Sequence, residues 1–286
     1  MITYSEITKR TKNLGRLGAK TGSIGSSEYG YTIPFVKVGT GSPVIIVTAA
    51  IHARENLTAS LALDMADYAL KTKYTGALYF IPIVNPDGAL LIEYGETAFG
   101  EENADFLLRV NGGKTDFSLW KANGKAVDLN VNFDARWGQG RQNRFTPGPE
   151  NYVGKSPFSA AETRALRDFT LAINPDCTLS LHAKGRLVYW YFHQSDKAKV
   201  RDRRIAGFIA DETGYTLGSG FTDSAGGYKD WCVETPGIPA FTIEVASDYL
   251  SHPLGDDALT PGERAALISL PVKLLDIIAQ SISRRR

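Results

Sequence analysis

The sequence contains little cysteine, no long apolar run and no excess of either charge. The two cysteines, Cys177 and Cys232, are too few for a disulfide framework or a cysteine-based metal cluster, and both are expected to be reduced thiols. No run of 18 apolar residues occurs, which excludes a membrane-spanning helix. Lysine and arginine number 32 and aspartate and glutamate 31, a net charge of +1, so nucleic acid and anionic membranes are not expected partners.

A secretory leader is also lacking. The first 25 residues carry five basic side chains but no apolar segment of the signal-peptide type, so we expect a cytoplasmic protein. A secreted protein that has lost its leader is the alternative. Hydrophobic residues make up 43% and charged residues 22% of the 286 positions, which is ordinary for a globular protein. Because no repeat, low-complexity tract or linker divides the chain, we expect one domain over residues 1–286.

What the sequence does contain is a regular alternation of strand-length apolar runs with helix-length amphipathic stretches. We expect strands over residues 31–38, 43–50, 77–84, 177–182, 187–192 and 239–245, and helices over residues 3–17, 57–70, 106–110, 159–173, 198–213 and 261–282. Residues 39–42 predict a hairpin turn, 85–88 a further turn, 22–30 a connector, 138–157 a long surface loop, and 159–162 a capping box. This alternation is typical of an α/β sheet covered by helices on both faces.

The apolar run at residues 44–50 leads directly into His52-Ala53-Arg54-Glu55. Positions i and i+3 lie on the same side of a first helical turn, so the imidazole of His52 and the carboxylate of Glu55 can converge. They do so at the carboxyl end of a strand, where open α/β sheets place their ligands. A nitrogen and a carboxylate oxygen suit zinc, which then needs one more protein ligand. A surface turn is the alternative interpretation of these four residues taken alone.

Three other places carry residues with possible chemistry. His182 ends the apolar run at 178–182 and is either a ligand or a satisfied core histidine. Glu244 interrupts the apolar strand at 241–245, and because an unpaired buried carboxylate is costly it must be paired, metal-bound or functional. Residues 120–133 are rich in asparagine side chains that could take part in a site, and the alternative interpretation is a solvated loop.

Eight short pieces stand in order along the chain. They are His-Ala-Arg-Glu at 52–55, Asn-Pro-Asp-Gly at 85–88, Trp-Lys-Ala-Asn at 120–123, Val-Asp-Leu-Asn-Val-Asn-Phe at 127–133, Ser-Ala-Ala-Glu-Thr at 159–163, Ser-Leu-His-Ala-Lys-Gly at 180–185, Gly-Gly-Tyr-Lys-Asp-Trp at 226–231 and Thr-Ile-Glu at 242–244. In these pieces the chain resembles the zinc carboxypeptidases, the metallocarboxypeptidase superfamily, over nearly its whole length. It is most similar to the bacterial γ-D-glutamyl-diaminopimelate peptidases.

The resemblance implies a single α/β domain with a mixed, roughly eight-stranded twisted sheet flanked by helices. It implies one zinc ion per chain and a peptidoglycan-derived peptide as substrate, cut at the γ-D-glutamyl–diaminopimelate amide bond by a zinc-activated water. The residues it implies are His52, Glu55 and His182 as zinc ligands, Glu244 as general base, Lys121 at the position of the arginine that polarises the scissile carbonyl in broader family members, Arg54 and Asn130 as substrate contacts, and Tyr228 as a mobile aromatic over the bound substrate.

One position departs from the family pattern. Val131 stands where the superfamily usually has the arginine that grips the terminal carboxylate of the substrate, and valine can neither carry charge nor donate a hydrogen bond. The candidates to replace it are Arg136, Arg141, Arg144 and Arg186. Two other functions stay open on this ground. One is a zinc carboxypeptidase or amidohydrolase acting on another small peptide or an N-acyl amino acid, and the other is a non-catalytic muropeptide-binding protein.

Overall fold

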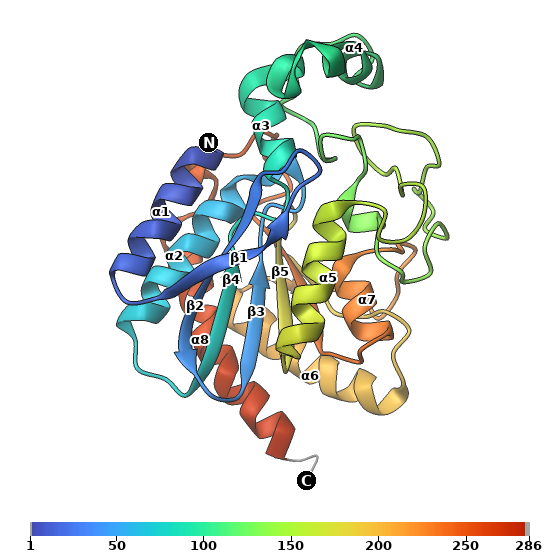
Figure 1. Ribbon diagram of the computed structural model, residues 1–286. Helices are drawn as coiled ribbons and strands as arrows, with labels where there is room; N and C mark the ends of the chain where they lie inside the picture. Colours follow the sequence, from blue (N-terminus) through green and yellow to red (C-terminus); the bar gives the residue numbers. More distant parts are fainter. Residues whose placement is uncertain (1, 284–286) are drawn as a thin grey trace.

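Eight strands form one mixed, twisted sheet in the computed structural model, which describes residues 2–283 (Figure 1). The strands are β1 (Lys20–Ser26), β2 (Thr32–Thr40), β3 (Val44–Thr48), β4 (Gly76–Ile81), β5 (Cys177–Ala183), β6 (Leu187–Tyr189), β7 (Thr216–Leu217) and β8 (Ala240–Val245), in the spatial order β1-β2-β4-β3-β5-β8-β6-β7. The central strands β4, β3, β5 and β8 run parallel, and antiparallel neighbours β2 and β6 flank them. The predicted α/β fold with about eight strands is confirmed.

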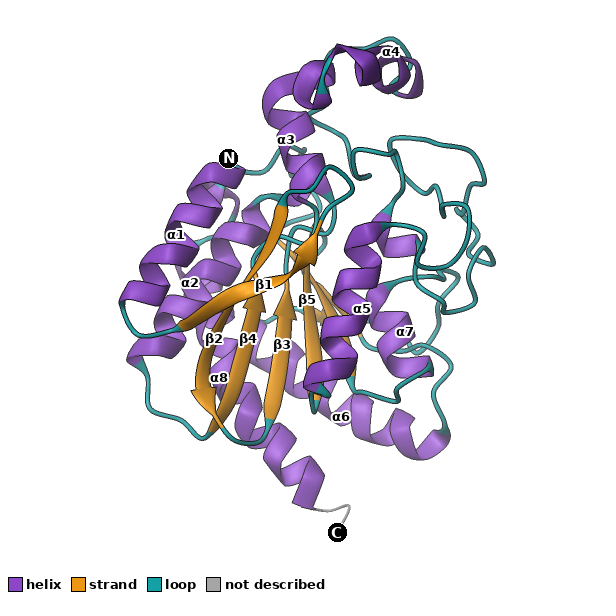
Figure 2. Ribbon diagram, in the orientation of Figure 1, coloured by secondary structure: helices purple, strands orange, loops and turns teal. Residues whose placement is uncertain are grey.

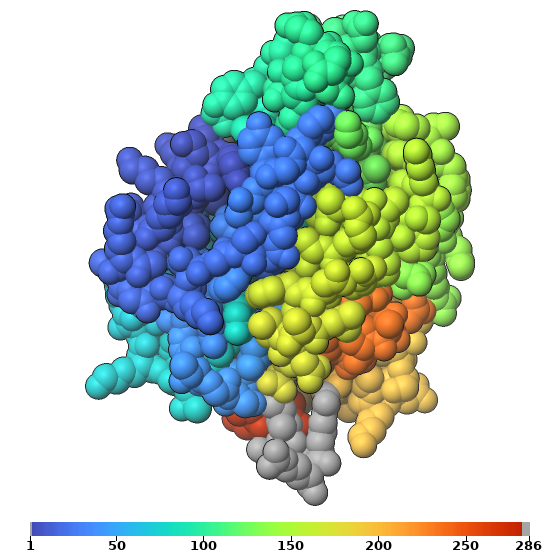
Figure 3. Space-filling model, in the orientation of Figure 1, coloured from blue at the N-terminus to red at the C-terminus, as the bar shows by residue number. Residues whose placement is uncertain are grey.

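Helices cover both faces of this sheet (Figure 2). On one face lie α1 (Tyr4–Arg16), α2 (Leu57–Lys71), α6 (Asp196–Thr213) and α8 (Pro261–Ser283), and on the other lie α5 (Ala161–Ile173) and α7 (Tyr228–Glu234). The remaining helices, α3 (Pro86–Tyr94) and α4 (Glu101–Val110), lie at one end of the molecule; α3 is buried over its first six residues, and the space-filling view shows the region around α4 projecting (Figure 3). Within residues 2–283, no helix is long and apolar enough to cross a membrane.

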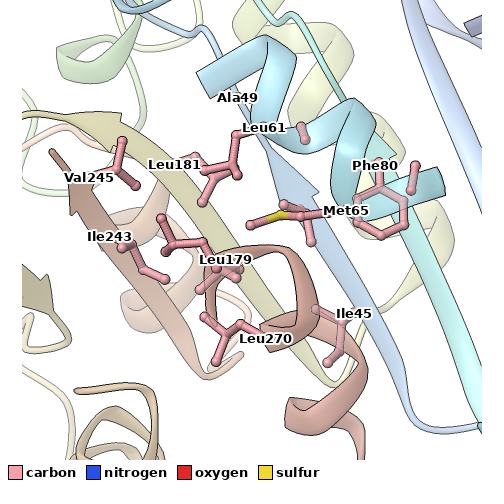
Figure 4. Packing of buried hydrophobic residues seen from close by; sticks show 14 of the residues in the cluster. Ile45, Ala49, Leu61, Met65, Phe80, Leu179, Leu181, Ile243, Val245 and Leu270 are labelled. Atoms are coloured by element: carbon pink, nitrogen blue, oxygen red, sulfur yellow. The ribbon is translucent and has the colours of Figure 1, made fainter. Parts of the chain in front are cut away.

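The central strands are held by a core between the sheet and the α2–α8 layer. In Figure 4, Leu61 and Met65 of α2 and Leu270 of α8 pack against side chains of β3, β5 and β8, and all are fully buried. On the other face, Ile46 of β3 and Ala240 of β8 belong to a second cluster with residues of α5 and α7, while the alternate residues of β5 are the buried polar side chains of Thr178, Ser180 and His182. Each fully buried Leu or Ile side chain contributes about 1.5–3 kcal/mol. Burial on both faces explains the near-continuous apolar runs in the sequence and fixes the carboxyl ends of the strands in space.

Two predictions for the amino-terminal region are wrong. Residues 22–30 are not merely a connector, because β1 occupies most of them and pairs antiparallel with β2. Strands β2 and β3 do not form a hairpin, because β4 lies between them and pairs with both. The physical reason is the crossover through α2, which returns the chain to lay β4 parallel to β3 and leaves the other edge of β4 for β2.

Local predictions at three other points also need correction. Asn85 does not close a simple turn but caps α3, its Oδ1 accepting from the backbone N–H of Gly88, with Pro86 in the first helical turn. No capping box opens α5, since its N-cap is Ala160 and Glu162 is buried in other contacts. The aromatic strand expected over residues 187–192 ends at Tyr189. The helices expected over 3–17, 159–173 and 261–282 are confirmed.

Candidate metal centre

Three buried side chains meet at the carboxyl edge of the central strands. His52 follows β3 through a short loop, Glu55 ends the 3₁₀ turn Ala53–Glu55, and His182 lies near the end of β5. The Nδ1 atoms of His52 and His182 lie 2.9 Å and 3.1 Å from the two carboxylate oxygens of Glu55. One ligand atom from each residue falls within 4.8 Å of the others, so the three can hold one metal ion.

The backbone around residues 52–55 is fixed by segments distant in sequence. The N–H groups of Ala53 and Arg54 donate to the carbonyls of Lys121 and Trp120, at 3.1 Å and 2.9 Å. The side-chain amide of Asn85 donates to the carbonyl of Ile51 at 3.2 Å. A turn lacks the regular backbone hydrogen bonds of a helix or a sheet, and these long-range bonds take their place. They hold His52 and Glu55 on the same side of the turn.

Asp128 holds the far nitrogen of the first histidine. Its Oδ1 lies 3.3 Å from Nε2 of His52, and it also accepts backbone N–H bonds from Asn130 and Asn151. Burial alone would lower the pKa of His52, but the carboxylates of Glu55 and Asp128 outweigh it and raise that pKa to about 9. Burial alone would raise the pKa of Glu55, but His52 and His182 hold it well below its ordinary value. The carboxylate on Nε2 fixes the tautomer that leaves Nδ1 free for a metal.

The donor set fits zinc. Two imidazole nitrogens and one carboxylate oxygen are the ligands of a catalytic zinc site, which keeps one position open. Both Nδ1 atoms lie within hydrogen-bonding distance of Glu55, and metal binding to these atoms requires neutral imidazoles and an ionised carboxylate.

Beside the three ligands lies a pocket of about 400 Å³. Its lining includes positively charged, negatively charged and aromatic side chains, among them Lys121, Lys229, Asp223, Glu244, Tyr191 and Phe221. A larger groove of about 690 Å³ lies between α1 and the turn at 254–257, and it contains none of the candidate site residues. The ligands and the pocket beside them are therefore the candidate site.

Glu244 lies on the wall of this pocket. It stands on β8 directly opposite His182 in the parallel register of β5 and β8, which is why a carboxylate in an apolar strand reaches the site. Burial raises the pKa of Glu244 to about 7, and the negative charge of Glu55 adds to the rise. A bound cation would lower this pKa again, because it favours the ionised carboxylate.

The structure brings most of the predicted site residues together, but two lie elsewhere. The side chain of Tyr228 is 1% exposed, packs against Phe133 and pairs its hydroxyl with Thr170, so it lies in the core and does not cover the pocket. Arg54 is outside the described pocket lining and donates to the carbonyl of Leu119. Asn130 does line the pocket, with its Oδ1 accepting from the backbone N–H of Tyr228.

None of the four arginines suggested as a substitute clamp lines the pocket in the described part of the chain. Arg136 pairs with Glu234, Arg141 with Asp223 and Arg186 with Glu263, and Arg144 is exposed. Val131 itself does line the pocket, so the position lacking a cation is part of the site.

Two pocket residues were missed by sequence reasoning. Asp128 lies inside the piece at 127–133, but its role depends on the imidazole of His52, which the sequence does not place beside it. Lys229 lies in the first turn of α7 with its side chain 11% exposed, pairs with Asp230 at 2.5 Å and donates to the carbonyl of Tyr191. A cation after the Gly226-Gly227 pair was visible in the sequence, but not the helix that aims it into the pocket.

Fold and site together define an α/β metalloprotein whose metal lies at the carboxyl ends of its central parallel strands. Residues 18–253 match the family model described as zinc carboxypeptidase. Gamma-D-glutamyl-L-diamino acid endopeptidase 1 of Lysinibacillus sphaericus is 32% identical over 254 residues, which cover 82% of this chain and 62% of that relative. The chain belongs to the zinc carboxypeptidase family, and His52, Glu55 and His182 form its zinc site.

Solved structures show the same fold at low identity. Bovine thrombin-activatable fibrinolysis inhibitor, solved with tick carboxypeptidase inhibitor, superposes with a TM-score of 0.74 at 20% identity and covers 99% of this chain and 96% of its own. Murein-tripeptide amidase MpaA of Escherichia coli O157 has a TM-score of 0.59 at 20% identity and covers 90% of this chain and 94% of its own. This chain spans 62% of the length of the first curated relative.

Proposed function

We propose that this protein is a zinc peptidase that hydrolyses the amide bond between γ-D-glutamate and diaminopimelate in peptidoglycan stem peptides. The observation that carries the proposal is the pairing of charges in the pocket. Lys229 and Asp230 form a partly buried ion pair there, and Asp223 adds a second carboxylate. The distal end of diaminopimelate carries both an amine and a carboxylate. Its carboxylate can pair with the lysine and its amine with an aspartate, so no charge is left unpaired when the substrate binds. The endopeptidase from Lysinibacillus, which acts on γ-D-glutamyl-L-diamino acid bonds by its name, supports the same substrate class.

The chain's own residues suggest how the bond is cut. Zinc, when bound, supplies a Lewis acid that activates water and polarises the scissile carbonyl. In this proposal Glu244, which lines the pocket and stands opposite His182 in the β5–β8 register, takes a proton from the attacking water and passes it to the leaving amine. Lys121, with its side chain 21% exposed and its amine 3.9 Å from the carboxylate of Glu150, lines the same pocket and in this proposal stabilises developing negative charge.

A second candidate is favoured by the same lysine. An ordinary peptide ending in an acidic side chain would also find a partner in Lys229, and this would be a carboxypeptidase activity. The two candidates differ in the linkage they cut, because only the first acts on a γ-D-glutamyl bond.

The test is incubation of the zinc-loaded protein with L-Ala-γ-D-Glu-meso-diaminopimelate, with products read by mass. Two matched peptides serve as controls, one with L-lysine in place of diaminopimelate and one with an α-linked L-glutamate at the carboxyl end. We expect release of diaminopimelate, slower cleavage of the lysine peptide by about tenfold or more, and no rapid cleavage of the α-linked peptide. Release of α-linked glutamate with an intact γ-D-glutamyl bond would reject the proposal in favour of the second candidate.

The role of Lys229 is tested separately. Lys229→Met removes the cation and Lys229→Arg keeps it, so discrimination between the diaminopimelate and lysine peptides should vanish in the first variant and persist in the second. If the wild type and both variants discriminated equally between the two peptides, a group other than Lys229 would bind the distal carboxylate of diaminopimelate.

A further inference from the structure

Two buried carboxyl groups outside the metal centre are held by neighbouring donors on the same stretch of backbone. Asp87 of α3 and Glu162 of α5 are each 0% exposed, and the consecutive backbone N–H groups of Glu28 and Tyr29 donate to Glu162 and Asp87 respectively, which brings the two carboxyl groups together. Two carboxyl groups can hydrogen-bond to each other only when one of them carries a proton, because an ionised carboxylate only accepts. Two ionised carboxylates held together in a site closed to water would repel strongly. Burial and proximity therefore favour a proton on the pair.

The groups around the pair donate hydrogen bonds but supply no positive charge among the described contacts. The hydroxyl of Ser27 and the N–H of Tyr29 donate to Asp87, and the N–H of Glu28 donates to Glu162. The charged or titratable groups facing the pair are Glu28 from the segment before β2 and the Tyr4 hydroxyl from α1, while Lys125 turns away to the hydroxyl of Tyr29. Burial raises the pKa of Asp87 to about 6 and that of Glu162 to about 8.

The pair is connected to the metal centre through Asn123. The amide nitrogen of Asn123 donates to Glu162 at 3.1 Å, while its oxygen accepts from the N–H groups of Lys125 and Val127, each at 3.0 Å. Asn123 thus closes the turn in the middle of residues 120–128, which we call the bridging segment. Lys121 lies near one end of this segment, and Asp128, the partner of His52, lies at the other.

We propose that Asp87 and Glu162 share one proton at neutral pH and that this protonated pair is a positioning element, holding the bridging segment, and with it Lys121 and Asp128, against the zinc site. Neither carboxyl group lines the pocket, so the pair acts through Asn123. When the proton leaves, two buried negative charges face each other, and the contact that anchors Asn123 loosens. The inference rests on membership of the zinc carboxypeptidase family and not on the identity of the substrate.

The shared proton is tested by the pH dependence of stability. The native pair keeps a proton up to about pH 8, whereas both carboxyl groups of the unfolded chain lose theirs near pH 4. The native state therefore binds more protons across this window, and stability falls as pH rises through it. Asp87→Asn places a permanent N–H opposite Glu162, so its Tm should fall less than that of the wild type between pH 5.5 and 8.5. An equal fall in both proteins would overturn the shared proton.

The positioning role is tested by Glu162→Ala, which removes the acceptor of Asn123. We expect kcat on any cleaved peptide to fall by about tenfold with a smaller change in KM, and zinc to be lost to a chelator about tenfold faster. Glu162→Gln can still accept from Asn123 and donate to Asp87, so it should restore most of both. The zinc measurement needs no substrate, and it separates failure of this inference from failure of the proposed function.

A matched control lies on the same helix. Thr170 is also 0% exposed, and Thr170→Val breaks its bond to the hydroxyl of Tyr228 without touching the bridging segment. This variant should lose stability but keep wild-type kcat and zinc retention. If Glu162→Ala and Thr170→Val were indistinguishable in kcat and zinc retention, the pair would be a purely structural contact and the proposal would be wrong.

Discussion

Replacement of Asp128 offers the sharpest test of how the zinc site is built. Its two carboxylate oxygens accept from three donors, namely Nε2 of His52 and the N–H groups of Asn130 and Asn151, and the residue is 2% exposed. A metal on Nδ1 of His52 requires the proton to stay on Nε2, where this carboxylate receives it. Asp128→Asn changes the acceptor to a neutral amide and leaves one NH₂ group facing a donor, whereas Asp128→Ala removes the acceptor altogether.

The expected loss follows from the strength of these bonds. A hydrogen bond to a charged acceptor contributes about 1.5–3 kcal/mol and a neutral one about 0.5–1.5 kcal/mol. The asparagine variant should therefore bind zinc about 5–10-fold more weakly, since each tenfold change corresponds to about 1.4 kcal/mol. The alanine variant should approach the upper part of the range of 10–100-fold seen when such outer partners are removed.

The measurement is competition for zinc against a fluorescent chelator at constant pH. Asp223→Asn is the control, because Asp223 lines the same pocket and pairs with Arg141 at 2.9 Å but does not contact a ligand residue. Its zinc affinity should equal that of the wild type. If Asp128→Ala bound zinc as tightly as the wild type, the orientation of His52 would have to come from the backbone alone.

Three further predictions concern the ligands and the pocket. His182→Ala should lose zinc to a chelator far more readily than the wild type, and full occupancy in that variant would remove His182 from the ligand set. Glu244→Gln should keep one zinc per chain and lose about 10²–10⁴-fold in kcat, so loss of the metal in this variant would make Glu244 a ligand. Val131→Arg should raise kcat/KM for the tripeptide, which ends in a free carboxylate, relative to a tetrapeptide that continues past diaminopimelate. A wild-type protein that already prefers the tripeptide strongly would show that a cation elsewhere in the site already holds that terminal carboxylate.

The metal ligands could be predicted because the sequence pattern indicates where the strands end. An apolar run that stops at a histidine, twice, places both imidazoles at the same edge of a parallel sheet, and Glu244 follows from the cost of burying a carboxylate in a strand. The pairing of β2 with β4 was not predictable in this way. Alternation and β-branched residues indicate that a strand exists, but its partner is chosen by the crossover through α2.

The buried position of Tyr228, which the sequence led us to expect over the substrate, has a related cause. On a helix, adjacent side chains point about 100° apart, so the exact first residue of α7 decides which of Tyr228 and Lys229 faces the pocket. The N-cap is Gly227, where no side chain announces the start of the helix. Tyr228 turns into the core beside Phe133 and Trp231, and the lysine receives the pocket position.

The placement of the ligands on β3, β5 and their loops also couples metal affinity to folding as a whole. His52 and His182 are 130 positions apart, and only the completed pairing of two central strands brings them together. A partly folded chain that lacks this pairing cannot bind the ion with all three ligands. Global unfolding should therefore release zinc, and each tenfold excess of free zinc over its dissociation constant should add about 1.4 kcal/mol to the free energy of unfolding. The zinc-loaded chain should accordingly resist denaturant better than the zinc-free chain.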